Sequence, residues 1–222
     1  MKGTGKMKKR MYAGILLLGL FAVWTYLVQT ADVRMVNETM VGFAAVNAWF
    51  HDLTGVCWWL YHVTDWLGLA PAAVCMMFAG VGLCQWVRRG SMAKVDADIL
   101  LLGGYYVSVI AYYLAFERFP VNFRPVLIGG VREASYPSST TLLVLSVMPS
   151  LVFQANRRLK NVRLKRGVRA ACVVFCVLMV GGRLLSGVHW LTDIVGAVLL
   201  SAGLFTVYKA LVLRWEALHG IW

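Results

Sequence analysis

The residues best suited to chemistry lie in one short polar stretch between two apolar runs, and they are Arg183, His189 and Asp193. If a helix begins near His189, the spacing of four positions places the His189 and Asp193 side chains on one face, within hydrogen-bonding reach. A carboxylate that accepts one ring N–H fixes the histidine tautomer and leaves the other ring nitrogen as a nucleophile or base. Arg183 adds a permanently charged guanidinium that suits phosphate or carboxylate. Taken alone, the stretch could equally be a capped helix start with an arginine at a membrane interface.

The surrounding sequence has the composition of a membrane protein. The chain has 222 residues, 60% of them hydrophobic, and its mean hydropathy is +0.69. Several apolar runs approach the roughly 20 residues that a helix needs to cross a bilayer. We therefore predict an all-α, polytopic membrane protein with one domain over residues 1–222, a six-transmembrane-helix bundle with short interfacial helices on its outer face. The predicted spans are about residues 11–28, 67–87, 99–116, 138–153, 170–182 and 190–212.

Basic residues are concentrated in short loops beside the apolar runs, and the net charge is +12. This distribution follows the positive-inside rule, so we expect both termini in the cytoplasm and no nucleic-acid partner. The expected location is a bacterial plasma membrane, with the stretch around His189 on the extracytoplasmic face. The first apolar run resembles a signal peptide, but it is long and lacks a convincing cleavage site, so we expect it to remain as the first span.

Residues 30–67 mix charged and aromatic side chains, which is typical of amphipathic helices at headgroup depth. We expect His51 and His62 in this segment to be interfacial residues rather than ligands. The five cysteines lie within or beside apolar runs, and their spacing is not that of a zinc site. We therefore expect the cysteines to act as small apolar residues, and we expect no metal and no cofactor.

Two further polar segments resemble the stretch around His189 in standing next to span ends. Residues 117–125 contain prolines that oppose a continuous helix. Residues 136–141 place Pro137 before a run of hydroxyl residues, which favours a helix start and a potential anion site. The predicted topology brings both segments and residues 182–193 to the outer face, which favours a shared site over three unrelated helix ends.

At these residues the sequence resembles the type 2 phosphatidic acid phosphatase superfamily of membrane lipid phosphatases. That family carries the motifs K-x6-R-P, P-S-G-H and S-R-x5-H-x3-D. The third motif is matched at Arg183, His189 and Asp193, with Gly182 in place of its leading serine. The resemblance implies that His189 attacks phosphorus to form a phosphohistidine and that Asp193 orients it. It also implies a six-span plan, which agrees with the prediction above, and a membrane lipid as substrate.

The first motif is matched at Arg124 and Pro125, but Glu117 stands at its lysine position and Arg118 comes one residue later. The resemblance implies that Arg124 and Arg183 hold the phosphoryl oxygens, as phosphoryl transfer requires. Arg118 is a further candidate phosphate contact, although it would lie about 100° round a helix from the lysine position.

The second motif is matched at Pro137 and Ser138, whereas Ser139 and Thr140 replace its glycine and histidine. The resemblance implies a phosphate cradle of backbone N–H groups at Ser138, Ser139 and Thr140. Thr140 cannot act as the general acid that the family histidine resembles, and such help is typically worth about 10²–10⁴-fold. An introduced change of that histidine to threonine is a further explanation of this departure.

The loss of the acid matters least when the leaving group is a phosphate, whose second pKa is about 6. We therefore expect a lipid diphosphate, such as a polyprenyl diphosphate, to be preferred over phosphatidic acid. Glu133 or Glu117 could replace the missing acid if burial raises its pKa. The alternatives are an inactive relative that binds lipid phosphate headgroups and a phosphotransferase with an alcohol acceptor. A small channel or transporter has little support, because charges within the predicted spans are sparse.

Overall fold

The computed structural model describes residues 2–220, so the two ends of the predicted 1–222 domain lie outside the described residues. Within this part of the chain, six helical segments are long and apolar enough to cross a membrane, which confirms the all-α, six-span membrane fold. They are α1 (Lys2–Thr30), α3 (Trp58–Leu67) continued by α4 (Leu69–Arg89), α5 (Ala97–Arg118), α6 (Ser139–Arg158), α7 (Val162–Leu185) and α8 (Leu191–Leu218).

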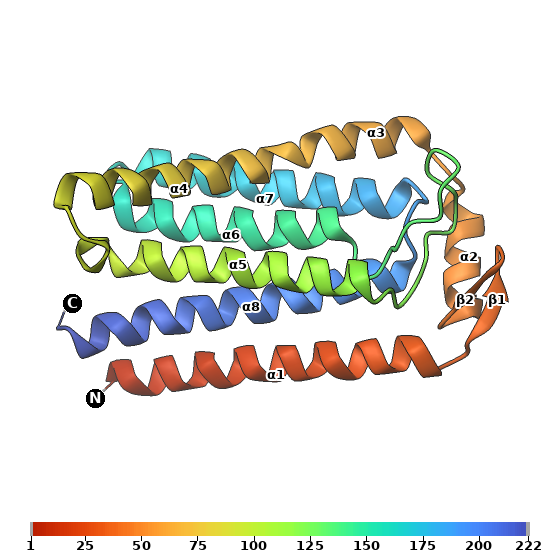
Figure 1. The fold of residues 1–222 in the computed structure, drawn as a ribbon, viewed down its shortest axis with the longest axis horizontal. Helices are drawn as coiled ribbons and strands as arrows, with labels where there is room; N and C mark the ends of the chain where they lie inside the picture. Colours follow the sequence, from red (N-terminus) through yellow and green to blue (C-terminus); the bar gives the residue numbers. More distant parts are fainter. Residues whose placement is uncertain (1, 221–222) are drawn as a thin grey trace.

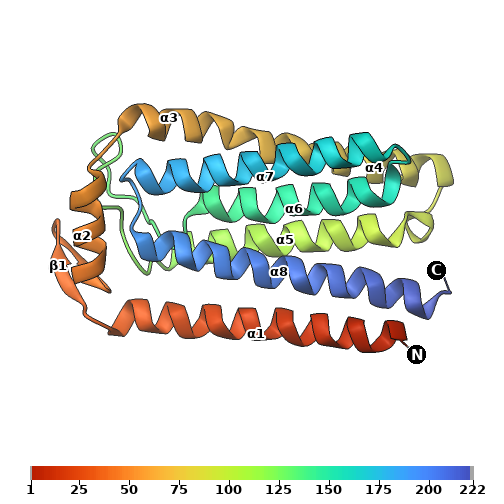
Figure 2. The same cartoon turned by 180° about the vertical axis from the view of Figure 1, so that it is seen from behind.

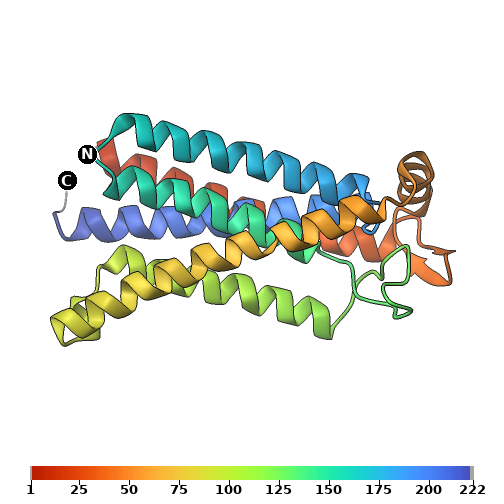
Figure 3. The same cartoon turned by 90° about the horizontal axis from the view of Figure 1, so that it is seen from above.

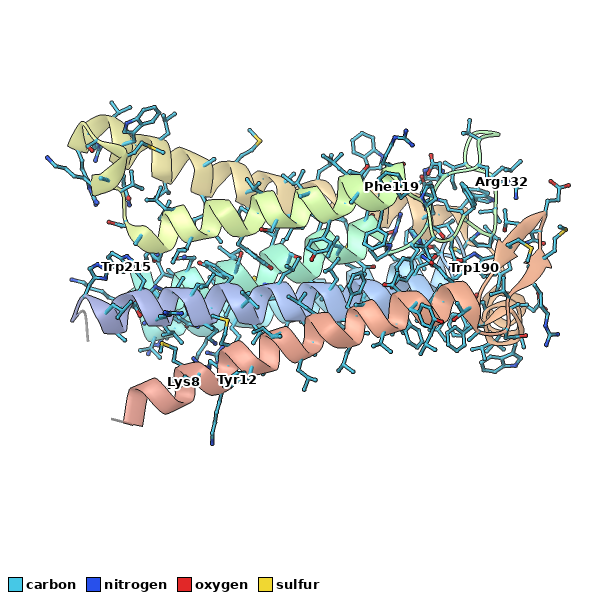
Figure 4. The ribbon with its side chains drawn as sticks, turned by 60° about the horizontal axis from the view of Figure 1, so that its bottom comes forward. Lys8, Tyr12, Phe119, Arg132, Trp190 and Trp215 are labelled. Carbon is cyan, nitrogen blue, oxygen red and sulfur yellow. The ribbon has the colours of Figure 1, made fainter. Side chains whose placement is uncertain are left out.

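The helices run side by side along the long axis of the molecule, and both termini lie at the same end (Figure 1 and Figure 2). We call this the terminal end and the opposite one the site end. In Figure 4 the labelled Lys8, Tyr12 and Trp215 lie toward the terminal end, whereas Trp190 and Arg132 lie at the site end.

Three helices start well before the expected spans, and the first of them, α1, begins at Lys2 rather than near residue 11. The second span begins at Trp58 rather than near residue 67, because Gly68 between α3 and α4 keeps a right-handed helical conformation. The aromatic residues that the sequence suggested as interfacial after residue 57 therefore belong to a span. The fifth span begins at Val162 rather than 170, where the Asn161 side chain accepts hydrogen bonds from the backbone N–H groups of residues 163 and 164.

A short hairpin and one helix form the remaining structure of residues 30–57. Strands β1 (Arg34–Val36) and β2 (Thr39–Val41) pair antiparallel around Asn37 and Glu38, which both have positive φ, as a two-residue hairpin turn requires. Helix α2 (Ala44–Thr54) lies across the bundle at the site end (Figure 1). Its exposed apolar residues Val46, Trp49 and Leu53 fit an interfacial helix, whereas the hairpin was not predicted.

Helix α8 lies at the centre of the bundle and packs against α1, α5 and α6. Its glycines permit close approach: a Cβ at Gly196 would lie 2.6 Å from the Tyr136 ring, and one at Gly203 would lie 2.8 Å from a Leu18 methyl. On the other side, α3–α4 and α5 diverge toward the site end (Figure 3). A lateral groove lies between these helices and the start of α6.

At the terminal end, ion pairs tie α5, α6 and α8 together. Asp98 Oδ2 of α5 lies 3.1 Å from Arg157 Nε and 2.8 Å from Arg158 Nη1, and Arg157 also pairs with Glu216 of α8. Asp98 and Glu216 are largely buried, so these pairs hold the helices together where α4 and α5 converge.

Candidate active site

The loop between α7 and α8 places His189 two residues before α8 begins, rather than inside the first turn of a helix. Gly187 in this loop has a φ of 69°, and a Cβ there would lie 1.9 Å from the carbonyl oxygen of Gly55. Only glycine fits such a position. His189 is 3% exposed, so the loop buries the ring at the site end of the bundle.

Asp193 is fully buried in the first turn of α8, and two donors fix its carboxylate. The backbone N–H of Trp190 donates to Oδ2 at 3.0 Å, and the Asn122 side chain donates to Oδ1 at 3.2 Å. Oδ2 lies 3.6 Å from Nδ1 of His189. The two side chains are therefore adjacent, as expected, but at 3.6 Å they are too far apart for a hydrogen bond, and the carboxylate is held in place by the helix start and by Asn122.

Two guanidinium groups converge on the other ring nitrogen of His189. Arg124 Nη1 lies 3.3 Å and Arg183 Nη2 lies 3.5 Å from Nε2. A guanidinium can only donate, so the lone pair of His189 must be on Nε2 and its proton on Nδ1, facing Asp193. Burial and the charges of Arg124 and Arg183 hold the pKa of His189 well below its ordinary value. The ring is therefore neutral at neutral pH, which a nucleophilic nitrogen requires.

Arg124 is oriented by the outer loop between α5 and α6, which folds back on itself. Its backbone N–H donates to the Glu133 carbonyl at 3.0 Å, and the Ser135 N–H donates to the Asn122 carbonyl at 2.9 Å. The Glu133 carboxylate lies 3.0 Å from Nε of Arg124. Glu133, which the sequence suggested as an acid, thus serves as the ion-pair partner of Arg124.

Arg183 is 1% exposed near the end of α7, and three residues of α3 contact its guanidinium. Nη1 lies 3.4 Å from the Thr64 hydroxyl and 3.7 Å from Asp65 Oδ1, and the guanidinium lies 5.1 Å from the centre of the Tyr61 ring. Glycine at position 182 has a structural explanation, because a Cβ there would lie 2.6 Å from the Thr64 methyl. The departure from the motif serine therefore allows α3 to pack closely against α7.

The start of α6 contributes less to the cluster than the sequence suggested. Ser138 is fully buried, and its backbone N–H donates to the Asp193 carbonyl at 3.2 Å, so it is not available to a ligand. Ser139 and Thr140 keep the first-turn N–H groups that have no acceptor within a helix. The Thr140 methyl lies 3.4 Å from the position of a Cβ on Gly68, so Thr140 faces α3–α4.

Arg118 and Glu117 lie outside the contacts around His189. Both are exposed at the end of α5, and the Arg118 guanidinium lies 5.4 Å from the centre of the Phe119 ring. His51 and His62 likewise pack against aromatic rings, those of Trp190 and Tyr61. Among the described residues, no group of three or more His, Cys, Asp or Glu side chains is arranged to hold a metal ion.

A lateral groove of about 460 Å³ opens between α3–α4, α5 and α6, beside the cluster. Its walls on α4 and α5 are apolar, and Asp65, Ser139 and Thr140 form its polar part. The lining residues are Asp65, Gly68, Leu69, Val109, Ile110, Tyr113, Leu114, Ser139, Thr140, Leu142 and Leu143. Because Asp65 also contacts Arg183, the groove adjoins the buried arginine pair.

Sequence reasoning named Arg124, Arg183, His189 and Asp193, and the structure brings all four together. It missed Asn122, Thr64 and Asp65. Nothing in the sequence around Asn122 indicates a functional role, apart from its place between two prolines. The signal for Asp65 was a carboxylate within an apolar run, because a charge inside a span is rare and usually functional.

The fold and the sequence can each be compared with those of known proteins. A crystal structure from Bacillus subtilis, described as the first transmembrane PAP2-type phosphatidylglycerolphosphate phosphatase, has the same fold, with a TM-score of 0.66 and 18% sequence identity. The similarity covers 90% of this chain and 96% of that one. A search of curated proteins found no match. The model of the PAP2 superfamily matches residues 99–216, which is just over half of the chain and includes the four clustered residues. The chain therefore belongs to the PAP2 superfamily.

Proposed function

We propose that the protein is a membrane lipid phosphatase that hydrolyses a lipid phosphate or diphosphate through a phosphohistidine on His189, with a polyprenyl diphosphate as the favoured substrate. One observation carries the proposal. The Nε2 lone pair of a buried, neutral His189 faces two guanidinium groups, while Nδ1 faces a fixed carboxylate. A nucleophile placed between two phosphate-binding groups is what phosphoryl transfer requires.

In the first step, Nε2 of His189 attacks the terminal phosphorus, the bond from phosphorus to the oxygen on the lipid side breaks, and the lipid leaves as an alcohol from a monophosphate or as a lipid monophosphate from a diphosphate. The ring then carries a positive charge, which the buried carboxylate of Asp193 stabilises through the N–H on Nδ1. Arg124 and Arg183 bind the phosphoryl oxygens as charge shifts onto them, with the free N–H groups at the start of α6 as further donors. In the second step, water attacks the phosphohistidine and releases inorganic phosphate.

The lateral groove supports a lipid substrate. Its apolar walls face the bilayer side of the bundle between α4 and α5, and its polar part meets Arg183 through Asp65. A prenyl or acyl chain in this groove would keep its apolar surface out of water while its phosphate reaches the arginine pair. The lipid would enter sideways from the membrane.

The residue at position 140 supports a preference for diphosphates. Thr140 supplies no acid for an alkoxide leaving group, whereas a leaving phosphate with a second pKa of about 6 needs little help. A polyprenyl diphosphate should therefore react faster than phosphatidic acid at the same site.

The distribution of charge supports an extracytoplasmic site in the plasma membrane. The loop between α6 and α7 and the start of α7 carry a dense set of basic residues, and these lie at the terminal end. By the positive-inside rule this end faces the cytoplasm, together with both termini. His189 lies at the opposite end.

The test is phosphate release by the purified protein in detergent. Wild type should release phosphate from a polyprenyl diphosphate faster than from phosphatidic acid, and His189→Ala should abolish both reactions. Lipid binding without phosphate release by wild type would contradict the enzyme proposal and favour the inactive, binding relative. Transfer of phosphate to an added alcohol in preference to water would instead identify a phosphotransferase.

A further inference from the structure

Asp65 is an ionisable residue in an unusual place. It is the acidic residue of the span Trp58–Arg89, and its side chain is 58% exposed although it lies 3.7 Å from the fully buried Arg183. A carboxylate within a span is costly and marks a functional site more often than a structural one. Its exposed part faces the lateral groove.

Asp65 and His189 contact different nitrogens of the same guanidinium. Nη2 of Arg183 faces Nε2 of His189, and Nη1 faces Asp65 and the Thr64 hydroxyl. In phosphoryl transfer the attacking and leaving oxygen or nitrogen atoms stand roughly in line on opposite sides of phosphorus. A phosphate bound to Arg183 and attacked by His189 directs its leaving oxygen away from the histidine, and Asp65 contacts the guanidinium nitrogen that does not face the ring.

The path of the lipid chain indicates the same position for the leaving oxygen. The leaving oxygen carries the lipid chain, and the groove is the apolar space that adjoins the arginine pair. A chain in the groove therefore places the leaving oxygen at its polar part, where Asp65 and Thr140 stand.

The other carboxylates near the site, those of Glu133 and Asp193, interact with other groups. Glu133 lies 3.0 Å from Nε of Arg124, in the loop outside the bundle rather than on the groove. Asp193 is buried behind the ring of His189, next to Nδ1 and between two donors. Neither of them lines the groove in which the lipid would lie.

We propose that Asp65 is the catalytic acid that protonates the leaving oxygen of lipid phosphomonoesters, the role that Thr140 cannot fill. This assignment rests on the proposed function and widens its substrate range. In this assignment, the proton that the leaving oxygen receives is the one shared between Asp65 and the bound phosphate.

The proton and the bonds balance over the two steps. In the first, the bond from Nε2 to phosphorus forms, the bond from phosphorus to the lipid oxygen breaks, and the Asp65 proton passes to that oxygen to give the free alcohol. In the second, the Asp65 carboxylate takes a proton from the attacking water, the bond from Nε2 to phosphorus breaks, and inorganic phosphate leaves. Asp65 is then protonated again for the next turnover.

The experiment compares kcat of wild type, Asp65→Asn and Asp65→Glu on phosphatidic acid and on farnesyl diphosphate. Asp65→Asn keeps the shape of the side chain but cannot give a proton to the leaving oxygen. We expect its kcat on phosphatidic acid to fall by about 100-fold or more, the usual value of general acid help, while kcat on the diphosphate falls by less than about tenfold. Asp65→Glu should keep a substantial part of the phosphatidic acid reaction.

A different pattern would overturn the assignment. An equal fall on both substrates in Asp65→Asn would show that Asp65 only holds Arg183 in place, and an unchanged kcat on phosphatidic acid would remove it from the reaction. Glu117→Gln serves as the matched control, because Glu117 is exposed at the end of α5 outside the contacts around His189, and a selective loss on phosphatidic acid in that variant would move the acid role to Glu117. If wild type releases no phosphate from either lipid, the proposed function fails, and the role of Asp65 fails with it.

Discussion

The close packing of α3 on α7 at Gly182 can be tested by a pair of substitutions. In Gly182→Ala the new Cβ would lie 2.6 Å from the Thr64 methyl, about 1 Å closer than ordinary contact, and the next atom would be a Leu60 methyl at 3.5 Å. Thr64 is a buried, β-branched residue that cannot rotate away easily. Overpacking of this kind costs about 1–3 kcal/mol, against a gain in helix propensity of up to about 1 kcal/mol.

Thr64→Ser removes the clashing methyl and keeps the hydroxyl that contacts Arg183. Alone it should cost about 1 kcal/mol for the lost methyl. In the Gly182→Ala, Thr64→Ser double variant the clash is gone, so the two effects should not add. We expect a favourable coupling of about 1–3 kcal/mol between the two positions, which is the signature of direct contact.

The assay is the thermal unfolding of the four proteins in detergent, with phosphate release measured below the transition. Gly182→Ala should lower both the unfolding temperature and the rate of phosphate release, because a shift of α3 moves Thr64 and Asp65 away from Arg183. Gly181→Ala is the matched control, since a Cβ at Gly181 meets no atom within 4 Å. Additive effects in the double variant, or an equal effect of Gly181→Ala, would refute the packing argument.

Three further predictions follow. Asn122→Ala removes a donor at 3.2 Å from the buried Asp193 carboxylate and should lower kcat by about 10-fold or more if Asp193 acts as proposed, since a hydrogen bond to a charged group contributes about 1.5–3 kcal/mol; an unchanged kcat would argue against this role. Because burial and two arginines lower the pKa of His189, kcat/KM of wild type should hold as pH falls through about 6.5. Arg124→Gln removes one cation, raises that pKa, and should move the acid limb to higher pH; an unmoved limb would contradict the assignment. Arg157→Ala removes the arginine that joins Asp98 to Glu216 at the terminal end, although Asp98 keeps Arg158, and should lower stability by roughly 1–3 kcal/mol, seen as an earlier thermal transition, with kcat below the transition unchanged.

The fold was largely predictable because hydropathy reports directly on membrane spans. The six apolar runs were evident, but their ends were not. His62 and Asp65 made residues 58–67 look interfacial, although tertiary contacts with α7 place them in a span. The basic residues after Asn161 likewise suggested a loop, but they form the first turns of α7. The hairpin at Asn37 and Glu38 has too few residues to give a pattern.

The site was predictable where one motif carried both spacing and chemistry. His189 and Asp193 were paired from their spacing, yet the pairing depends on an Asp193 carboxylate fixed by Trp190 and Asn122, not on a helix through His189. The contacts of Arg183 with α3 join residues more than 100 positions apart, which no local pattern encodes. Local sequence does not explain Gly182 either, because the group that excludes a side chain there is the Thr64 methyl across the helix interface.

The central claim is that phosphate passes through a covalent bond to His189. The most direct test is mass spectrometry of the protein after mixing with farnesyl diphosphate and quenching in alkali, which preserves phosphohistidine. The account predicts a phosphate on the peptide that contains His189, its loss after acid treatment, and its absence in His189→Ala together with loss of phosphate release. Continued phosphate release by His189→Ala, or phosphate on another residue, would contradict it.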